Sequence, residues 1–220
     1  MRFATKYKGL SFITKDPLYG YAHEFDVYQK FYTVKPGDIV IDAGANTGYV
    51  SLLFSKLAGN AGKVYAFEPD AINIVHIKDN IALNPGTDNI IIDDLLLWNE
   101  NTFIDFYESG TVGSSALWLP ESDKIVKKQT ITIDDWARRN NIPKIDFIKM
   151  NIEGAEIEAV EGCIETIRNS QPDFAIYSNH TVGGELTYIK LESFFKSINY
   201  PYKTISKGTE IVTYAGGGIR

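Results

Sequence analysis

The chain has 220 residues, 44% of them hydrophobic and 23% charged, which suits one globular domain with its own core. Its formal net charge of −6 argues against a protein that grips nucleic acid through a basic face. The single cysteine, Cys163, excludes an intrachain disulfide and a cysteine metal site, and favours a reducing, cytoplasmic location. No run approaches 18 apolar residues and the N-terminus lacks the apolar core of a signal peptide, so we expect no membrane span.

The first 36 residues are predicted to form a helical extension that packs on the sheet of the following domain. Its aromatic residues recur at helical spacing: Phe25, Tyr28 and Tyr32. The main domain is expected to cover residues 37–215. A run of three glycines near the end predicts a flexible tail at 216–220.

The main domain alternates strand-like and helix-like patterns, which is typical of a parallel sheet with helices on both faces. Five strands are predicted, at 38–43, 63–67, 89–92, 145–150 and 173–178. Helical spacing of apolar residues follows the first, second, fourth and fifth of these strands. Two short extra strands are expected around a loop, at 102–107 and 130–133.

The chain ends with two further strand patterns, at 202–206 and 210–215, separated by three residues that include Gly208. So short a gap predicts an antiparallel hairpin, whereas an all-parallel dinucleotide-binding sheet would add further crossover units. We therefore predict an α/β protein with a mostly parallel, seven-stranded, Rossmann-like sheet and a C-terminal antiparallel hairpin. This arrangement resembles the sheet of class I methyltransferases.

The stretch DAGANTG, residues 42–48, joins the first strand to its helix at the sheet edge where such folds bind ligands. Gly44 permits a sharp turn, and Gly48 lets the helix begin close to the strand. Free amides at a helix start favour an anionic group such as a carboxylate. An NAD fingerprint would have a glycine where Asn46 stands, so the pattern favours a nucleoside with an amino-acid tail over a dinucleotide.

Acidic residues end the next two strands. Glu68 ends the second strand, where an acid accepts hydrogen bonds from ribose hydroxyls. Asp93 and Asp94 end the third strand, where an adenine amino group would lie. Two adjacent acids are equally typical of an exposed loop.

Four stretches resemble, in order and spacing, the FkbM-type methyltransferases: GDIVIDAGANTGYVS, VYAFEPDAINIVHIKDNIALN, TIDDW and IDFIKMNIEGAEIEAVEG. The resemblance spans about residues 37–180. It implies S-adenosylmethionine (SAM) as methyl donor and, as acceptor, a hydroxyl group, often on a sugar or a glycosylated natural product. Together with the strand-end positions above, it gives a predicted cofactor-binding set: Asp42, Gly44, Ala45, Asn46, Thr47, Gly48, Glu68, Asp94 and Asn151.

A sugar hydroxyl is a poor nucleophile, so a general base would help methyl transfer; His180 and Glu153 are candidates for it, and Lys149 is the third predicted catalytic residue. His180 follows the fifth strand, and its ordinary pKa of about 6.5 suits a base; the alternative is a histidine with only local hydrogen bonds. Glu153 could take a proton or bind the SAM ammonium, or it could only place a charge at a helix start, as expected of Glu156. Lys149 lies within a strand and needs an acidic partner; Glu153 or Glu68 is expected.

One position departs from the family pattern, because Asn151 stands where an aspartate is expected. An asparagine amide cannot act as a base, so a catalytically weak SAM-binding protein stays an alternative, beside an NAD(P)-dependent oxidoreductase. No ligand spacing is diagnostic of a metal, and none is predicted. The loop 108–122 is the expected acceptor site, with Trp118 as a stacking residue or else an anchor on the core. Neither the acceptor's identity nor the oligomeric state follows.

Overall fold

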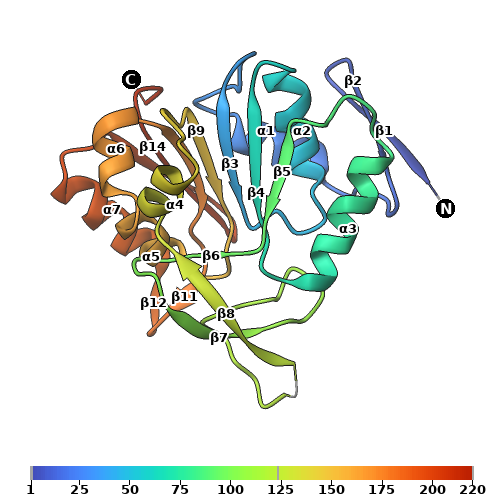
Figure 1. Ribbon diagram of the computed structural model, residues 1–220. Helices are drawn as coiled ribbons and strands as arrows, with labels where there is room; N and C mark the ends of the chain where they lie inside the picture. Colours follow the sequence, from blue (N-terminus) through green and yellow to red (C-terminus); the bar gives the residue numbers. More distant parts are fainter. Residues whose placement is uncertain (1, 123, 220) are drawn as a thin grey trace.

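The computed structural model describes residues 2–122 and 124–219, and its centre is a seven-stranded sheet (Figure 1). In chain order the strands are β3 (Ile39–Ala43), β4 (Lys63–Phe67), β5 (Ile90–Asp93), β9 (Phe147–Met150), β10 (Asp173–Tyr177), β13 (Tyr202–Lys207) and β14 (Glu210–Ala215). Across the sheet they follow the order β13-β14-β10-β9-β3-β4-β5. The first five are parallel, and β14 is antiparallel to both β10 and β13. The predicted mostly parallel sheet with its C-terminal hairpin is confirmed.

Helices cover both faces of this sheet. On one face lie α1 (Tyr21–Tyr28), α2 (Tyr49–Ala58) and α3 (Ala71–Ala82). On the other lie α4 (Ile133–Arg139), α5 (Glu156–Glu161), α6 (Ile164–Ser170) and α7 (Thr187–Ser197). Successive strand residues enter opposite hydrophobic clusters, as Val40 and Ile41 do, so the central strands are apolar at nearly every position.

The N-terminal extension contains more than the predicted helix. A hairpin of β1 (Phe3–Tyr7) and β2 (Leu10–Thr14) precedes α1. Tyr32 lies beyond the end of α1 and stacks on Phe147, with ring centroids 5.4 Å apart. The helical spacing of the aromatic residues therefore marked a contact with the sheet but overstated the length of the helix.

Two small sheets lie beyond the carboxyl ends of the central strands. One has the order β6-β8-β7, from β6 (Leu96–Leu97), β7 (Phe103–Tyr107) and β8 (Ile125–Ile131), and is seen beneath the main sheet in Figure 1. The other pairs β11 (Thr181–Val182) with β12 (Glu185–Leu186). The strand expected at 130–133 in fact begins earlier and ends at Ile131, because Thr132 caps α4 by accepting the Asp135 amide.

A further expectation differs from the structure. The single helix expected after the fourth strand is divided into α5 and α6 at Gly162, whose missing Cβ would lie 2.2 Å from the Trp98 carbonyl oxygen. In the tail predicted to be flexible, the Gly218 amide donates to Asp173 Oδ1 at 2.8 Å, and Arg220 lies outside the described residues. Among the described helices, none combines the length and apolar character that crossing a membrane requires.

Candidate active site

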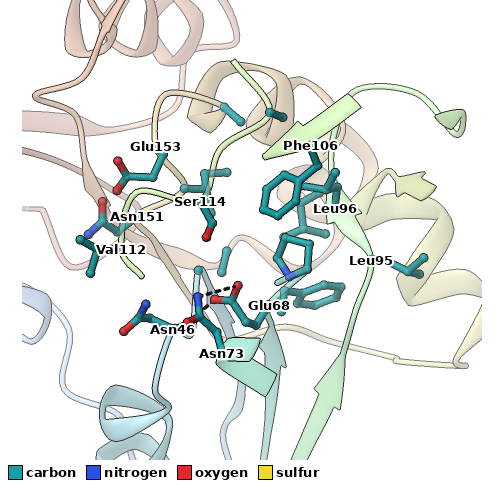
Figure 2. Close-up of a pocket in the computed structure, with 18 of the residues that line it drawn as sticks. Asn46, Glu68, Asn73, Leu95, Leu96, Phe106, Val112, Ser114, Asn151 and Glu153 are labelled. Atoms are coloured by element: carbon teal, nitrogen blue, oxygen red, sulfur yellow. Dashed lines mark hydrogen bonds between the residues drawn. The ribbon is translucent and has the colours of Figure 1, made fainter. Parts of the chain in front are cut away.

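A cleft opens at the carboxyl ends of four adjacent strands, β9, β3, β4 and β5 (Figure 2). Residues that follow these strands line it in the same order: Asn151, Gly44, Glu68 and Leu95. The loop that follows β7 completes the wall with Thr111, Val112, Ser114 and Ala116. The cleft thus opens at the strand ends where the sequence predicts ligand binding.

The turn after β3 depends on backbone conformations that few residues adopt. Gly44, Asn46 and Gly48 have φ values of 75°, 51° and 79°. A Cβ on Gly44 would lie 2.0 Å from the Asn151 carbonyl oxygen, so only glycine lets the turns after β3 and β9 meet. Asparagine tolerates the left-handed conformation better than most residues, which explains Asn46 in the middle of the turn.

Glu68 is buried at the floor of the cleft and holds neighbouring groups in place. Its Oε2 accepts the Asn46 amide at 2.7 Å, and its Oε1 accepts the Asp70 amide at 3.0 Å and Asn73 Nδ2 at 3.3 Å. Burial raises the pKa of the Glu68 carboxyl, and these hydrogen bonds oppose the rise. Because a carboxylate offers about four acceptor positions, one is left for a ligand hydroxyl.

The far side of the cleft is apolar. Phe106, Leu95 and Leu96 lie opposite Asn151 and Glu153 in Figure 2. Asp94, predicted to bind adenine, is exposed and is not among the lining residues. Asp93 accepts Trp136 Nε1 at 2.8 Å and the Leu95 amide at 3.1 Å. The chain turns just after β5, so leucines take the position expected for the acids.

Asp42 and Lys149 form a buried ion pair beneath the cleft. They face each other across β3 and β9, with Lys149 Nζ 2.9 Å from Asp42 Oδ1. The ammonium also donates to the carbonyl oxygens of Ala43 at 3.0 Å and Gly44 at 2.7 Å. The expectation that Lys149 pairs with Glu153 or Glu68 was wrong. Because neither Asp42 nor Lys149 lines the cleft, the pair acts on the shape of the turn.

Three of the predicted cofactor residues lie near the cleft but do not line it: Ala45, Thr47 and Gly48. The Thr47 carbonyl accepts Asn80 Nδ2 at 2.8 Å, which ties the turn to α3. A Cβ on Gly48 would lie 3.0 Å from Ile77, so α2 begins in close contact with α3. These residues shape the turn, while Gly44 and Asn46 meet the cleft.

His180 lies between two carboxylates. Its Nδ1 is 3.1 Å from Glu156 Oε1, and its Nε2 is 3.5 Å from Glu153 Oε1. Burial lowers the pKa of the His180 imidazole, but the nearby carboxylates of Glu153 and Glu156 outweigh burial and raise the pKa to about 10. His180 is therefore an imidazolium at neutral pH, which contradicts its predicted role as a general base.

Glu153 and Asn151 stand side by side on one side of the cleft (Figure 2). Glu153 has φ 56°, and its carboxylate is about one third exposed. The backbone amide of Asn151 donates to the Ala43 carbonyl at 3.2 Å. Glu156, expected to be only a helix-start charge, is fully buried and accepts the amides of Ile152 and Gly154.

The loop 108–122 is tied to the cleft at one end. Asp70 Oδ2 accepts the Gly110 amide at 2.8 Å and Ser114 Oγ at 2.6 Å. Trp118 is exposed and packs edge-on against Tyr107, with ring centroids 5.5 Å apart. It does not anchor the loop on the core, and so its face is free to stack on a ligand.

Some lining residues were missed at the sequence level, notably Asn73, Leu96 and Phe106. The run of leucines after Asp94 was the available signal, since a buried apolar run beyond a strand end needs something to cover it. Among residues 2–122 and 124–219, no group of three or more His, Cys, Asp or Glu side chains is arranged to hold a metal ion.

Comparison with known proteins agrees with this geometry. The sequence model of the methyltransferase FkbM domain matches residues 42–202. The chain is 25% identical over 162 residues to the 2-O-methyltransferase NoeI of Sinorhizobium fredii, covering 66% of this chain and 65% of NoeI. It is 24% identical over 132 residues to the hexuronic acid methyltransferase AglP of Haloferax volcanii, covering 60% of this chain and 52% of AglP.

The crystal structure of a methyltransferase FkbM from Methylobacillus flagellatus shares the fold, with a TM-score of 0.62 at 19% identity, covering 89% of this chain and 49% of that one. The chain thus spans between half and about two thirds of these three proteins. The family match covers well over half of the chain, and the strand order is that of a class I methyltransferase. The chain therefore belongs to the FkbM family of SAM-dependent methyltransferases.

Proposed function

We propose that this chain transfers a methyl group from SAM to a hydroxyl group of a saccharide or a glycosylated small molecule. The observation that carries the proposal is the cleft, which offers an apolar side, one buried acid and a glycine turn in the order of the strands. The names of two relatives, a 2-O-methyltransferase and a hexuronic acid methyltransferase, support a sugar acceptor.

The residues that line the cleft suit SAM in charge and shape. Leu95, Leu96 and Phe106 suit a flat purine, and the spare acceptor position of Glu68 suits a ribose hydroxyl. Gly44 holds the turn against the Asn151 carbonyl, and the Asn46 and Asn151 side chains line the cleft beside it, where their amide groups can hydrogen-bond the amino-acid part of SAM. When bound, SAM would supply a methyl group activated by a positively charged sulfur.

The residues of this chain would then orient the acceptor and exclude water. Thr111 and Ser114 bring hydroxyls to the cleft, and Trp118 stands near it on the same loop. None of the described lining residues is Lys, Arg or His, while two, Glu68 and Glu153, are acids. A neutral sugar is favoured over a hexuronate, whose carboxylate would meet like charge without a cation.

The same cleft weighs against the two alternatives. A dinucleotide would bring its pyrophosphate against the Asn46 side chain, with no cation among the described lining residues to pair it. A catalytically weak SAM-binding protein is favoured only by Asn151 in place of the family's aspartate. Glu153 supplies a carboxylate beside that position, which reduces the weight of the substitution.

Titration calorimetry with SAM tests the cofactor part. We expect Glu68→Gln, which keeps the side-chain shape, to weaken SAM binding about tenfold through loss of a charge-assisted hydrogen bond. Glu68→Ala is expected to weaken binding further, because the Asn46 amide also loses its partner. Glu100→Gln, at an exposed acid, is the matched control. Equal affinity in all variants would count against this placement of the ribose.

Methyl transfer to a panel of neutral and acidic glycosides tests the acceptor part. We expect transfer to neutral glycosides and slower transfer to hexuronates. SAM binding without transfer to any compound would favour the catalytically weak protein, and tight NADH binding would favour the oxidoreductase. A cytoplasmic location, the lack of a nucleic-acid partner and the domain limits at residues 36 and 215 stay predictions.

A further inference from the structure

The turn that carries Glu153 is folded around a buried carboxylate. Glu156 Oε1 accepts the amides of Ile152 at 3.0 Å and Gly154 at 3.3 Å, and its side chain is fully buried. Gly154 has φ 104°, and a Cβ there would lie 2.9 Å from Val182 and 3.3 Å from Leu117. The turn is therefore clamped between β11 and the loop that follows β7.

This clamp forces Glu153 into an unusual backbone conformation. Its φ of 56° is left-handed, a conformation that strains a residue other than glycine or asparagine. Such strain persists only where the surroundings fix it, and it is concentrated at functional sites. Here the conformation brings the carboxylate to the cleft wall beside Asn151 (Figure 2).

His180 connects the buried carboxylate with the one at the cleft. Its two ring nitrogens face Glu156 Oε1 and Glu153 Oε1 at 3.1 Å and 3.5 Å. Held as an imidazolium, the ring carries a proton on both nitrogens and cannot accept one from a substrate. Glu153 is then the acidic side chain on this wall that is free to accept one, since the other lining acid, Glu68, already accepts three protein donors.

We propose that Glu153 takes the hydroxyl proton of the acceptor, and that His180, anchored on Glu156, is the positioning residue that aims Glu153. This rests on the proposed function. As the acceptor oxygen gains its bond to the methyl carbon, the carbon–sulfur bond breaks with its electron pair left on sulfur. The hydroxyl proton passes to the Glu153 carboxylate, so charge and atoms balance without a further reactant.

The test compares Glu153→Gln with the parent protein in turnover and in SAM binding. We expect kcat to fall about 10²–10⁴-fold, the usual contribution of a general base, with SAM affinity within about twofold. Glu161→Gln, at an exposed acid on α5, is the matched control and should leave both unchanged. Equal rates in the parent and Glu153→Gln would overturn the proposal while leaving the proposed function intact.

The positioning role has its own readouts. His180→Ala should lower kcat about tenfold with the acceptor KM unchanged, and His180→Gln should recover part of the loss, because its amide still donates to Glu153. In the cofactor-free protein, the NMR titration of the His180 ring should have its midpoint near 10, and Glu153→Gln should lower it. A His180 midpoint near the ordinary value would overturn the positioning role. Failure of the parent to methylate any acceptor would instead overturn the proposed function, and this proposal with it.

Discussion

Two charged clusters flank the end of β9, and they differ in how much of each meets the cleft. Asp42 and Lys149 are closed off, with side-chain exposures of 0% and 3%, and the ammonium is used on backbone carbonyls. In the second cluster exposure rises from 0% at Glu156 through 19% at His180 to 31% at Glu153. The closed cluster fixes the shape of a turn, and the graded one presents a charge to a ligand. Burial alone therefore does not mark a charge as catalytic.

The largest effect that separates the clusters is expected for Lys149→Met. It leaves Asp42 buried without its cation, which should cost about 3–5 kcal/mol of unfolding free energy in urea denaturation. Lys144→Met removes an exposed partner of Asp146 and should cost less than about 1 kcal/mol. The double variant with Asp42→Asn should recover part of the loss. A stable Lys149→Met protein without turnover would instead return Lys149 to the catalytic residues.

The graded cluster should show a dependence of stability on pH. The pKa of His180 is raised from 6.5 to about 10 in the folded protein, so the folded state binds the proton more tightly. This stabilisation is fully present below pH 6.5 and is lost as pH rises through about 10; it is on the order of a few kcal/mol. The check is the unfolding free energy from denaturation curves below pH 6.5 and above about pH 10. The same difference measured in His180→Gln gives the contribution of all other titrating groups. Parallel pH dependence in the two proteins would contradict it.

A backbone change at the meeting point of the two turns should have a smaller effect. Gly44→Ala forces a Cβ toward the Asn151 carbonyl, and we expect a loss of about 2–3 kcal/mol and much weaker SAM binding. Gly86→Ala is the matched control, because Gly86 also has a positive φ but no atom lies within 4 Å of a Cβ there. Its cost should be about 1 kcal/mol, with SAM binding unchanged. Equal losses of stability in Gly44→Ala and Gly86→Ala would mean that the positive φ alone, and not the contact with the Asn151 carbonyl, requires glycine at position 44.

The comparison also shows what could be predicted from the sequence. The central strands were readable because both of their faces are buried, and the glycine turn because its chemistry is local. The partner of Lys149 could not be predicted, because the pair depends on the register of two strands that are far apart in the chain. That register places Asp42 opposite Lys149. The prediction that Asp94 meets the ligand differs from the structure by one residue. Asp94 is exposed to solvent, and the next residue, Leu95, lines the cleft.

The smallest effect is expected where the sequence seemed most unusual. If Glu153 accepts the proton, the missing aspartate at position 151 costs little, and Asn151→Asp should change kcat by less than about threefold. A second carboxylate beside Glu153 would also add like charge, so a slight decrease is more consistent with the proposal than an increase. The measurement is kcat on the best neutral acceptor, with Asn151→Ser as a control for loss of the amide. A rise of tenfold or more in Asn151→Asp would show that the base had been missing, and that Glu153 only shapes the cleft.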